Sequence, residues 1–205
     1  MKLKFLPSLL TAAALAVGAA PAAHAAIIIA DTVIAFHDSG AGPMAGPYGG
    51  TFPGAFPVAV PLSHATDGLG NTFLSLPTGS YITLGFSGGF VFDGTGLDLF
   101  VSEVGGADEQ AEVWVSSDFG GSFTLLGIAT TATVSGFDLA SIGYAGNVNA
   151  VKIVGLDSLG GSPGFDLAFV QGLEGSVILV PEPGTLALLG LGLLGVVGSS
   201  LRRRN

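Results

Sequence analysis

The sequence predicts an all-β protein, an antiparallel β-sandwich or jelly roll. Several short segments alternate apolar and polar residues with a period of two, which a half-buried strand requires. Glycine (34 of 205 residues) and proline (11) are abundant between these segments, where they favour turns. Between residues 26 and 178 no window of helical length carries a clear apolar face. Short alternating strands separated by turns are typical of sandwiches and jelly rolls.

The strands are predicted in chain order from composition and alternation. Residues 27–30 and 32–36 are β-branched and aromatic, so each favours a strand. A loop rich in glycine and proline follows over 38–61, with an edge strand around 56–60. Loops of this length in compact domains are often functional or mobile. Clear alternation predicts the remaining strands at 81–86, 97–102, 111–116, 123–125, 151–154 and 165–170.

Two local patterns predict turns. The stretch 116–123, Ser-Ser-Asp-Phe-Gly-Gly-Ser-Phe, is similar to the Asp-box hairpin of secreted β-proteins. We expect Asp118 to accept hydrogen bonds from its own turn, while a glycine supplies a positive φ. Separately, Gly-Phe-Asp-Leu-Ala occurs at 136–140 and again at 164–168. The repetition predicts that two strands begin in the same way, with a glycine bend, an aromatic anchor and an aspartate at the strand edge.

The N-terminus predicts export. Lys2 and Lys4 precede an apolar run over 9–17, and the small residues Ala23 and Ala25 form a cleavage site. Residues 1–25 are therefore predicted to be a signal peptide, and the mature chain begins at Ala26. The export machinery is the partner that this segment implies.

The C-terminus predicts a membrane-spanning segment. Val180-Pro181-Glu182-Pro183-Gly184 interrupts regular structure, because proline fits neither a strand interior nor a helix interior. Residues 185–201 carry no charge until Arg202, Arg203 and Arg204. As a single transmembrane helix they would span about 25 Å, and the arginines would stay on the cytoplasmic side. This arrangement indicates a sorting tail over 179–205; an ordinary membrane anchor is the alternative.

The tail resembles the PEP-CTERM sorting signal of exported proteins of Gram-negative bacteria. The resemblance rests on Pro181-Glu182-Pro183, the apolar segment and the terminal arginine cluster. It implies processing by an exosortase-type membrane protease. It also implies transit through the inner membrane and delivery to the cell envelope or extracellular matrix, where exopolysaccharide is a candidate partner.

Residues 26–178 are left for one β-sandwich domain, a normal size for a single core. Lys152 is the only lysine or arginine in this segment, against fourteen of the fifteen acids, so its net charge is −13. Such a surface repels nucleic acid but is compatible with divalent cations. The chain has no cysteine, which excludes disulfides, thiolate zinc sites and cysteine nucleophiles.

Several of the predicted strands also resemble galactose-binding-like jelly rolls, which include many carbohydrate-binding modules. The stretches that carry this resemblance are 82–86, 98–103, 112–118 and 164–168. The resemblance implies a structural calcium ion at the sandwich edge, and calcium is the one candidate cofactor. The candidate ligands are Asp98, Glu103 and Asp166, followed by Asp93 and Asp138. The alternative is that these are ordinary turn and edge carboxylates.

Aromatic residues suggest where a sugar could stack. Trp114 is the first candidate, followed by Tyr48, Tyr81 and Tyr144. Because Trp114 alternates with valines, we expect it on the sheet face opposite theirs, although a tryptophan between the two sheets fits the pattern equally well.

Catalysis has little support in the sequence. His37 and His64 are the only histidines after the predicted signal peptide, and no Gly-x-Ser-x-Gly, His-Glu-x-x-His or Walker motif occurs. We therefore predict a non-catalytic structural or adhesive component of the cell surface or biofilm. A carbohydrate-binding module with an edge calcium site is the alternative, and a hydrolase is a third.

Overall fold

The structure is a computed structural model that describes residues 27–105, 108–130, 134–172 and 177–179. Regular structure within them consists of strands and two short 3-10 helices, η1 (Leu62–Ala65) and η2 (Leu139–Ile142). The strands are β1 (Ile28–Ile29), β2 (Thr32–His37), β3 (Tyr48–Thr51), β4 (Val58–Ala59), β5 (Thr72–Leu76), β6 (Tyr81–Gly85), β7 (Gly89–Val91), β8 (Leu99–Glu103), β9 (Gln110–Ser116), β10 (Thr124–Thr130), β11 (Val134–Phe137), β12 (Ala150–Gly155), β13 (Phe165–Gly172) and β14 (Val177–Leu179).

Several predicted segments lie outside the described residues. They are the signal peptide (1–25), the Pro-Glu-Pro motif, the transmembrane helix (185–201) and the terminal arginines. Within the described ranges, neither helix has the length and apolar character needed to cross a bilayer.

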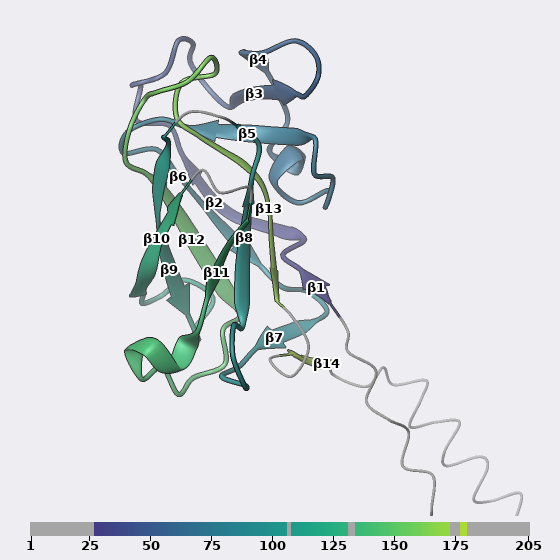
Figure 1. The fold of residues 1–205 in the computed structure, drawn as a ribbon, viewed down its shortest axis with the longest axis vertical. Coiled ribbons are helices and arrows are strands. Elements are labelled where there is room, and N and C mark those ends of the chain that lie inside the picture. Colours follow the sequence, from purple (N-terminus) through teal and green to yellow (C-terminus); the bar gives the residue numbers. More distant parts are fainter. Residues whose placement is uncertain (1–26, 106–107, 131–133, 173–176, 180–205) are drawn as a thin grey trace, which may run out of the picture.

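Two antiparallel sheets form the body of the molecule (Figure 1). The larger sheet has the order β11-β8-β13-β5-β3-β4, with β1 paired to β13. The smaller has the order β10-β9-β12-β6-β2, and β14 pairs with β7 separately. Most neighbours in these sheets are distant in sequence, as when β8 pairs with β13. The predicted all-β antiparallel sandwich is confirmed.

The core lies between the two sheets. Strand alternation turns one side chain in two toward it, and these side chains form a single buried cluster. The larger sheet contributes Leu74, Leu76, Leu99, Val101, Phe165 and Leu167, and the smaller contributes Ile82, Leu84, Val113, Val115, Val151 and Ile153. Glu112 and Trp114 alternate with the buried valines of β9 and are only half-buried, so they lie on the outer face.

Five strands were not predicted: β3, β5, β7, β11 and β14. In β3 the reason is glycine, which normally weakens a strand and was interpreted as loop. A methyl group on Gly49 would lie 2.1 Å from the carbonyl oxygen of Phe73 in β5, so only glycine allows this close approach. The predicted edge strand around 56–60 is confirmed, because β4 ends the larger sheet.

The prediction that the two Gly-Phe-Asp-Leu-Ala copies begin strands is wrong for the first copy. Phe137 ends β11, and Asp138 then caps η2 by accepting a 2.8 Å hydrogen bond from the Ala140 N–H. The second copy does begin a strand, β13, after Gly164 with φ of 111°. Tertiary context, not the local sequence, decides between the two outcomes.

The turn at 116–123 forms as predicted. Asp118 Oδ1 accepts hydrogen bonds from Ser116 Oγ (2.6 Å) and from the Ser122 N–H (2.9 Å). Gly120 has φ of 97°. The hydrogen bonds, that from Ser116 first, lower the pKa of Asp118 to about 2.

Candidate functional site

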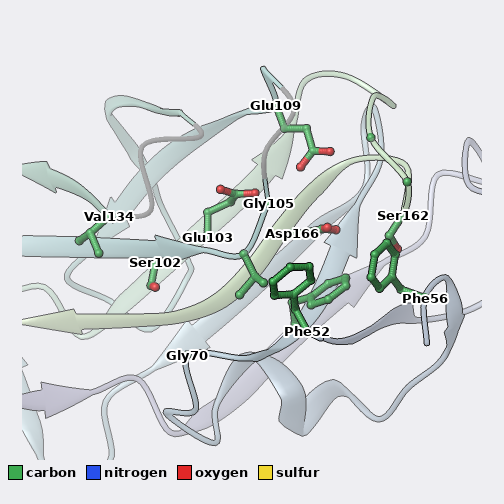
Figure 2. A pocket seen from close by; sticks show the side chains of 14 residues that line it. Phe52, Phe56, Gly70, Ser102, Glu103, Gly105, Glu109, Val134, Ser162 and Asp166 are labelled. Atoms are coloured by element: carbon green, nitrogen blue, oxygen red, sulfur yellow. The ribbon is translucent and has the colours of Figure 1, made fainter. Parts of the chain in front are cut away.

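A cavity of about 710 Å³ opens where β8 ends and β13 begins. Acidic side chains lie on one side of it and phenyl rings on the other (Figure 2). We call it the carboxylate pocket and define it by five lining residues: Phe52, Phe56, Glu103, Glu109 and Asp166. Its volume is within the range of small-ligand pockets in proteins.

The phenyl rings come from the loop between β3 and β4. Phe52 is 57% exposed and Phe56 is 39% exposed, with their ring centroids 6.4 Å apart. Phe56 packs against Phe73, a buried residue of β5, in an edge-to-face arrangement with the ring centroids 5.8 Å apart. Large apolar side chains exposed beside a cavity are typical of ligand-binding surfaces.

The three acids come from separate segments. Glu103 ends β8, Glu109 precedes β9, and Asp166 is the second residue of β13. Their exposed fractions are 5%, 2% and 6%. The Val104 N–H donates to the Asp166 carbonyl oxygen at 2.9 Å, which fixes the end of β8 beside β13. These acids are therefore brought together by long-range strand pairing.

Asp166 has hydrogen-bonding partners. Ser75 Oγ donates to its Oδ1 at 2.5 Å, and Ser75 Oγ lies 2.7 Å from Ser162 Oγ. Ser75 alternates with the core residues Leu74 and Leu76, so this network lies on the outer face of the larger sheet.

Glu103 and Glu109 are less well satisfied. Among the described residues, no donor outside this pair reaches either oxygen of Glu103 or Oε2 of Glu109, but the two carboxyl groups hydrogen-bond to each other when Glu109 carries a proton. Figure 2 shows both side chains directed toward one space beside Gly105. A methyl group on Gly105 would lie 2.2 Å from Glu103 Oε1 and 3.4 Å from Glu109 Oε2. Glu103 Oε1 therefore occupies the space that a side chain at 105 would take, and the two glutamates lie side by side against the Gly105 backbone.

Burial raises the pKa of all three acids. The value reaches about 7 for Glu103, about 8 for Glu109 and about 9 for Asp166. Repulsion between the carboxylates adds to the effect of burial at Glu109 and Asp166. Lys152, the only lysine or arginine in the described ranges, lies in β12 of the other sheet. The pocket therefore concentrates acidic groups that lack a cationic partner within the described structure.

The three predicted calcium ligands do not form one cluster. Glu103 and Asp166 lie in the carboxylate pocket, whereas Asp98 precedes β8 at its opposite end, about 16 Å away at the rise of an extended strand. There Asp98, Asp93 and Asp138 each offer an oxygen within 4.8 Å of the others. Both groups have the hard oxygen ligands that calcium prefers, although calcium takes six to eight.

Asp98 also has a structural role in this second cluster. It is fully buried and accepts hydrogen bonds from the N–H groups of Gly94 (3.0 Å) and Leu139 (2.8 Å). These two bonds connect the loop before β8 to the start of η2.

Trp114 lies on the outer face of the smaller sheet. Its Nε1 donates to Glu112 Oε2 at 3.0 Å. The Lys152 ammonium lies 5.5 Å from the Trp114 ring, 5.3 Å from Tyr81 and 4.7 Å from Phe123, all within cation–π range. The faces of Trp114 and Tyr81 are thus partly used by the protein's own lysine.

The other two tyrosines are less available for stacking. Tyr48 is buried and donates to the Pro163 carbonyl oxygen at 2.5 Å, and Tyr144 packs against the core.

Sequence reasoning did not identify Phe52, Phe56 or Glu109 as site residues. A signal for the first two was present, since both are followed by proline in the long loop that was expected to be functional or mobile. Glu109 had no comparable local signal, because it joins the pocket only when β8 and β9 enter different sheets.

Comparison with known proteins confirms the resemblance of the tail. Residues 179–204 match the PEP-CTERM protein-sorting motif. No curated protein sequence matches the chain.

The fold is similar to three solved structures, each with low sequence identity. One is a truncated AlyQ with CBM32 and alginate lyase domains (15% identity, TM-score 0.44), covering 75% of this chain and 34% of that chain. The present chain thus spans about a third of that protein's length. Another is the CBM32 of AlyQ in complex with 4,5-unsaturated mannuronic acid (15% identity, TM-score 0.42), covering 69% of this chain and 95% of that chain. A third is the C-terminal domain of a chitobiase from Bacteroides fragilis (14% identity, TM-score 0.46), covering 72% of this chain and 94% of that chain.

Proposed function

We propose that this chain is an exported surface protein, addressed by its C-terminal motif, whose β-sandwich binds a carbohydrate in the carboxylate pocket without catalysis. Binding of this kind would make it an adhesive component of the cell envelope or an exopolysaccharide matrix. The single observation that supports the binding role is the pocket itself, where exposed phenyl rings face buried carboxylates.

Export and sorting follow from the two ends of the chain. The proposed organisation is a signal peptide at 1–25, the β-sandwich at 26–178 and the sorting tail at 179–205. The motif at 179–204 supports processing by an exosortase-type membrane protease. Mass spectrometry of the protein recovered from cells should find Ala26 as the first residue and Arg202, Arg203 and Arg204 removed. Full-length protein in the cytosol, with Met1 and the arginines present, would contradict this assignment.

The pocket offers both kinds of contact that sugars use. The C–H face of a sugar ring packs against an aromatic ring, and Phe52 and Phe56 expose theirs. Sugar hydroxyls can donate to acceptors, and Glu103 and Glu109 have oxygens that no described residue outside this pair donates to. A ligand that supplies donors would relieve the unfavourable burial of these oxygens.

Binding can be tested on a glycan array with the full chain. We expect saturable signals that are lost in Phe52→Ala and Phe56→Ala and retained in Phe119→Ala. Phe119 is a matched control, since it is 65% exposed and does not line the pocket. Trp114→Ala tests the second candidate surface, so loss of binding in that variant alone would place the sugar on the outer face of the smaller sheet. A complete absence of glycan binding would overturn the proposal.

A hydrolase is the competing function, because two glutamates lie side by side in the pocket. Retaining glycosidases use paired carboxylates that stand about 5 Å apart and hold the scissile bond between them, and inverting enzymes place them farther apart. Glu103 and Glu109 are instead close enough to hydrogen-bond to each other, which leaves no room for that bond. We therefore expect no release of product from envelope polysaccharides. Release that is abolished by Glu103→Gln would overturn the non-catalytic assignment.

Calcium remains a proposal for either acidic group. A calcium-supported fold predicts that chelation lowers the melting temperature. Asp138→Asn and Glu103→Gln would then distinguish the two clusters, because only the variant in the occupied one should abolish the effect of chelation. A melting temperature that does not respond to chelation would exclude a stabilising ion.

A further inference from the structure

We infer that the carboxylate pocket recognises a sugar that carries a free amino group, as in a deacetylated hexosamine polymer. This inference rests on the proposed function and names the ligand class of the same site. It is carried by three features: acids without a compensating cation, two glutamates that lie side by side, and exposed phenyl rings at the rim.

The first feature is charge. Glu103, Glu109 and Asp166 are all more than nine-tenths buried, and Glu103 has no hydrogen-bond donor among the described residues except the carboxyl group of Glu109. An ammonium group brings three donors and a positive charge, whereas a neutral hydroxyl brings one donor and no charge. A uronic acid would be repelled by the same carboxylates. The pocket is thus electrostatically complementary to a cationic sugar.

The second feature is the pair of glutamates beside Gly105. Glu103 Oε1 lies 2.2 Å and Glu109 Oε2 lies 3.4 Å from the position that a Cβ at 105 would take, so the two carboxyl groups are neighbours. An ammonium group that enters from the cavity can donate to both glutamates and take the place of the proton that they share. A neutral group brings no charge that could replace that proton.

The third feature distinguishes an organic cation from a metal ion. A metal would use the carboxylates alone and would leave Phe52 and Phe56 without a role. A cationic sugar uses both sides of the pocket, because its ring can pack on a phenyl face and its ammonium group is attracted to the ring electrons.

The same groups predict how binding depends on pH. The titratable groups that act on the site are Glu103, Glu109, Asp166, Asp157 and Tyr48, and all are acids. When they are protonated, an ammonium group loses its charged partners. Affinity for an amino sugar should therefore rise above about pH 5.5 as Glu103 ionises, with release of protons on binding, and should fall again at alkaline pH as the amino group of the sugar loses its own proton.

The inference can be tested by calorimetry on the full chain in detergent, with a glucosamine hexamer and an N-acetylglucosamine hexamer as probes. We expect the glucosamine hexamer to bind at least about tenfold more tightly. Glu103→Gln and Glu109→Gln should each weaken it by about tenfold or more, because each removes one charged acceptor without changing its size. Asp31→Asn is the control, since it removes one exposed acid outside the pocket.

The outcomes separate this inference from the proposed function. If both hexamers bind equally and the Phe52→Ala variant binds neither, the sugar-binding function stands but the amino-group inference is wrong. If neither hexamer nor any arrayed glycan binds, both are wrong. A lysine peptide that binds as tightly as the glucosamine hexamer would also overturn the inference, because it carries the ammonium without the sugar. Affinity for the glucosamine hexamer that does not change with pH would do the same, and this measurement needs no variant.

Discussion

Buried carboxylates with few donors lower the stability of a protein, and among the described residues only the carboxyl group of Glu109 can donate to Glu103. Side chains of this kind are usually retained because they serve a function that a more stable alternative would lose. A substitution at Glu103 therefore tests whether its carboxylate stabilises the fold or binds a ligand.

Replacing Glu103 by methionine should raise the stability of the free protein at about pH 8. The change removes a buried charge and fills the same space with an apolar side chain, so we expect a gain on the order of 1 kcal/mol in the free energy of unfolding. Chemical denaturation measures it. Glu112→Met is the control, and it should give no gain, because Glu112 accepts a hydrogen bond from Trp114. A loss of stability in Glu103→Met would mean that the carboxylate has a stabilising partner.

Acid should weaken the turn around Asp118. Its pKa is lowered in the folded state, so its ionised form contributes stability above about pH 4 that is lost as the pH falls toward about 2. Asp118→Ala should lower the melting temperature at neutral pH, and the difference from the unchanged protein should shrink as the pH falls. Differential scanning calorimetry at several pH values measures this. A difference that stays constant with pH would show that the hydrogen bonds of the ionised carboxylate are not responsible.

At the scale of elements, the pocket depends on how closely β3 approaches β5. Gly49 lies opposite Leu74 in this pair, and β3 leads directly into the loop that carries Phe52 and Phe56. Any side chain at 49 would push the two strands apart. The close packing at Gly49 thus affects the position of the loop that carries Phe52 and Phe56.

Gly49→Ala should therefore destabilise the protein by on the order of 2 kcal/mol, as overpacking does elsewhere. It should also weaken glycan binding, because the loop moves with the strand. Gly70→Ala is a matched control for stability, since a side chain there meets no atom within 4 Å. Denaturation curves and the glycan array measure the two effects. If Gly49→Ala is as stable as Gly70→Ala, the close approach of β3 to β5 is not required.

On the scale of the whole molecule, acidic charge determines how stability changes with pH. Glu103, Glu109 and Asp166 all have a pKa above the usual value of a carboxyl group, so the folded state binds more protons than the unfolded chain between about pH 4 and pH 9. Their contribution to stability is complete below about pH 4 and is lost as the pH rises through 7 to 9. The domain's net charge of −13 acts in the same direction, because repulsion grows as these groups ionise.

The melting temperature of the free protein should accordingly be higher at about pH 5 than at about pH 9. The double variant Glu103→Gln and Glu109→Gln should show a smaller difference, because two of the responsible groups no longer titrate. Thermal unfolding monitored by circular dichroism measures both proteins. A protein more stable at the alkaline pH would show that these acids are not buried in the folded state.

The sequence alone determined the features that are encoded locally. Alternation with a period of two identified the strands that have one face in the core, because each side chain's face depends only on its position along the strand. The turn around Asp118 was predictable because its hydrogen bonds join residues at most four positions apart. The sorting motif was recognisable because it is a contiguous stretch of sequence.

Only the tertiary structure decided which side chains share a site. Glu103, Glu109, Asp166 and the two phenylalanines come from four segments, and strand pairing across long sequence separations brings them together. The extended strand β8 separates Asp98, which precedes it, from Glu103, which ends it. Tertiary context also gives two copies of one pentapeptide different roles. Local sequence specifies which face of a strand is apolar. It does not specify which distant strand becomes its neighbour, because that choice depends on how well the apolar faces of the whole chain pack together.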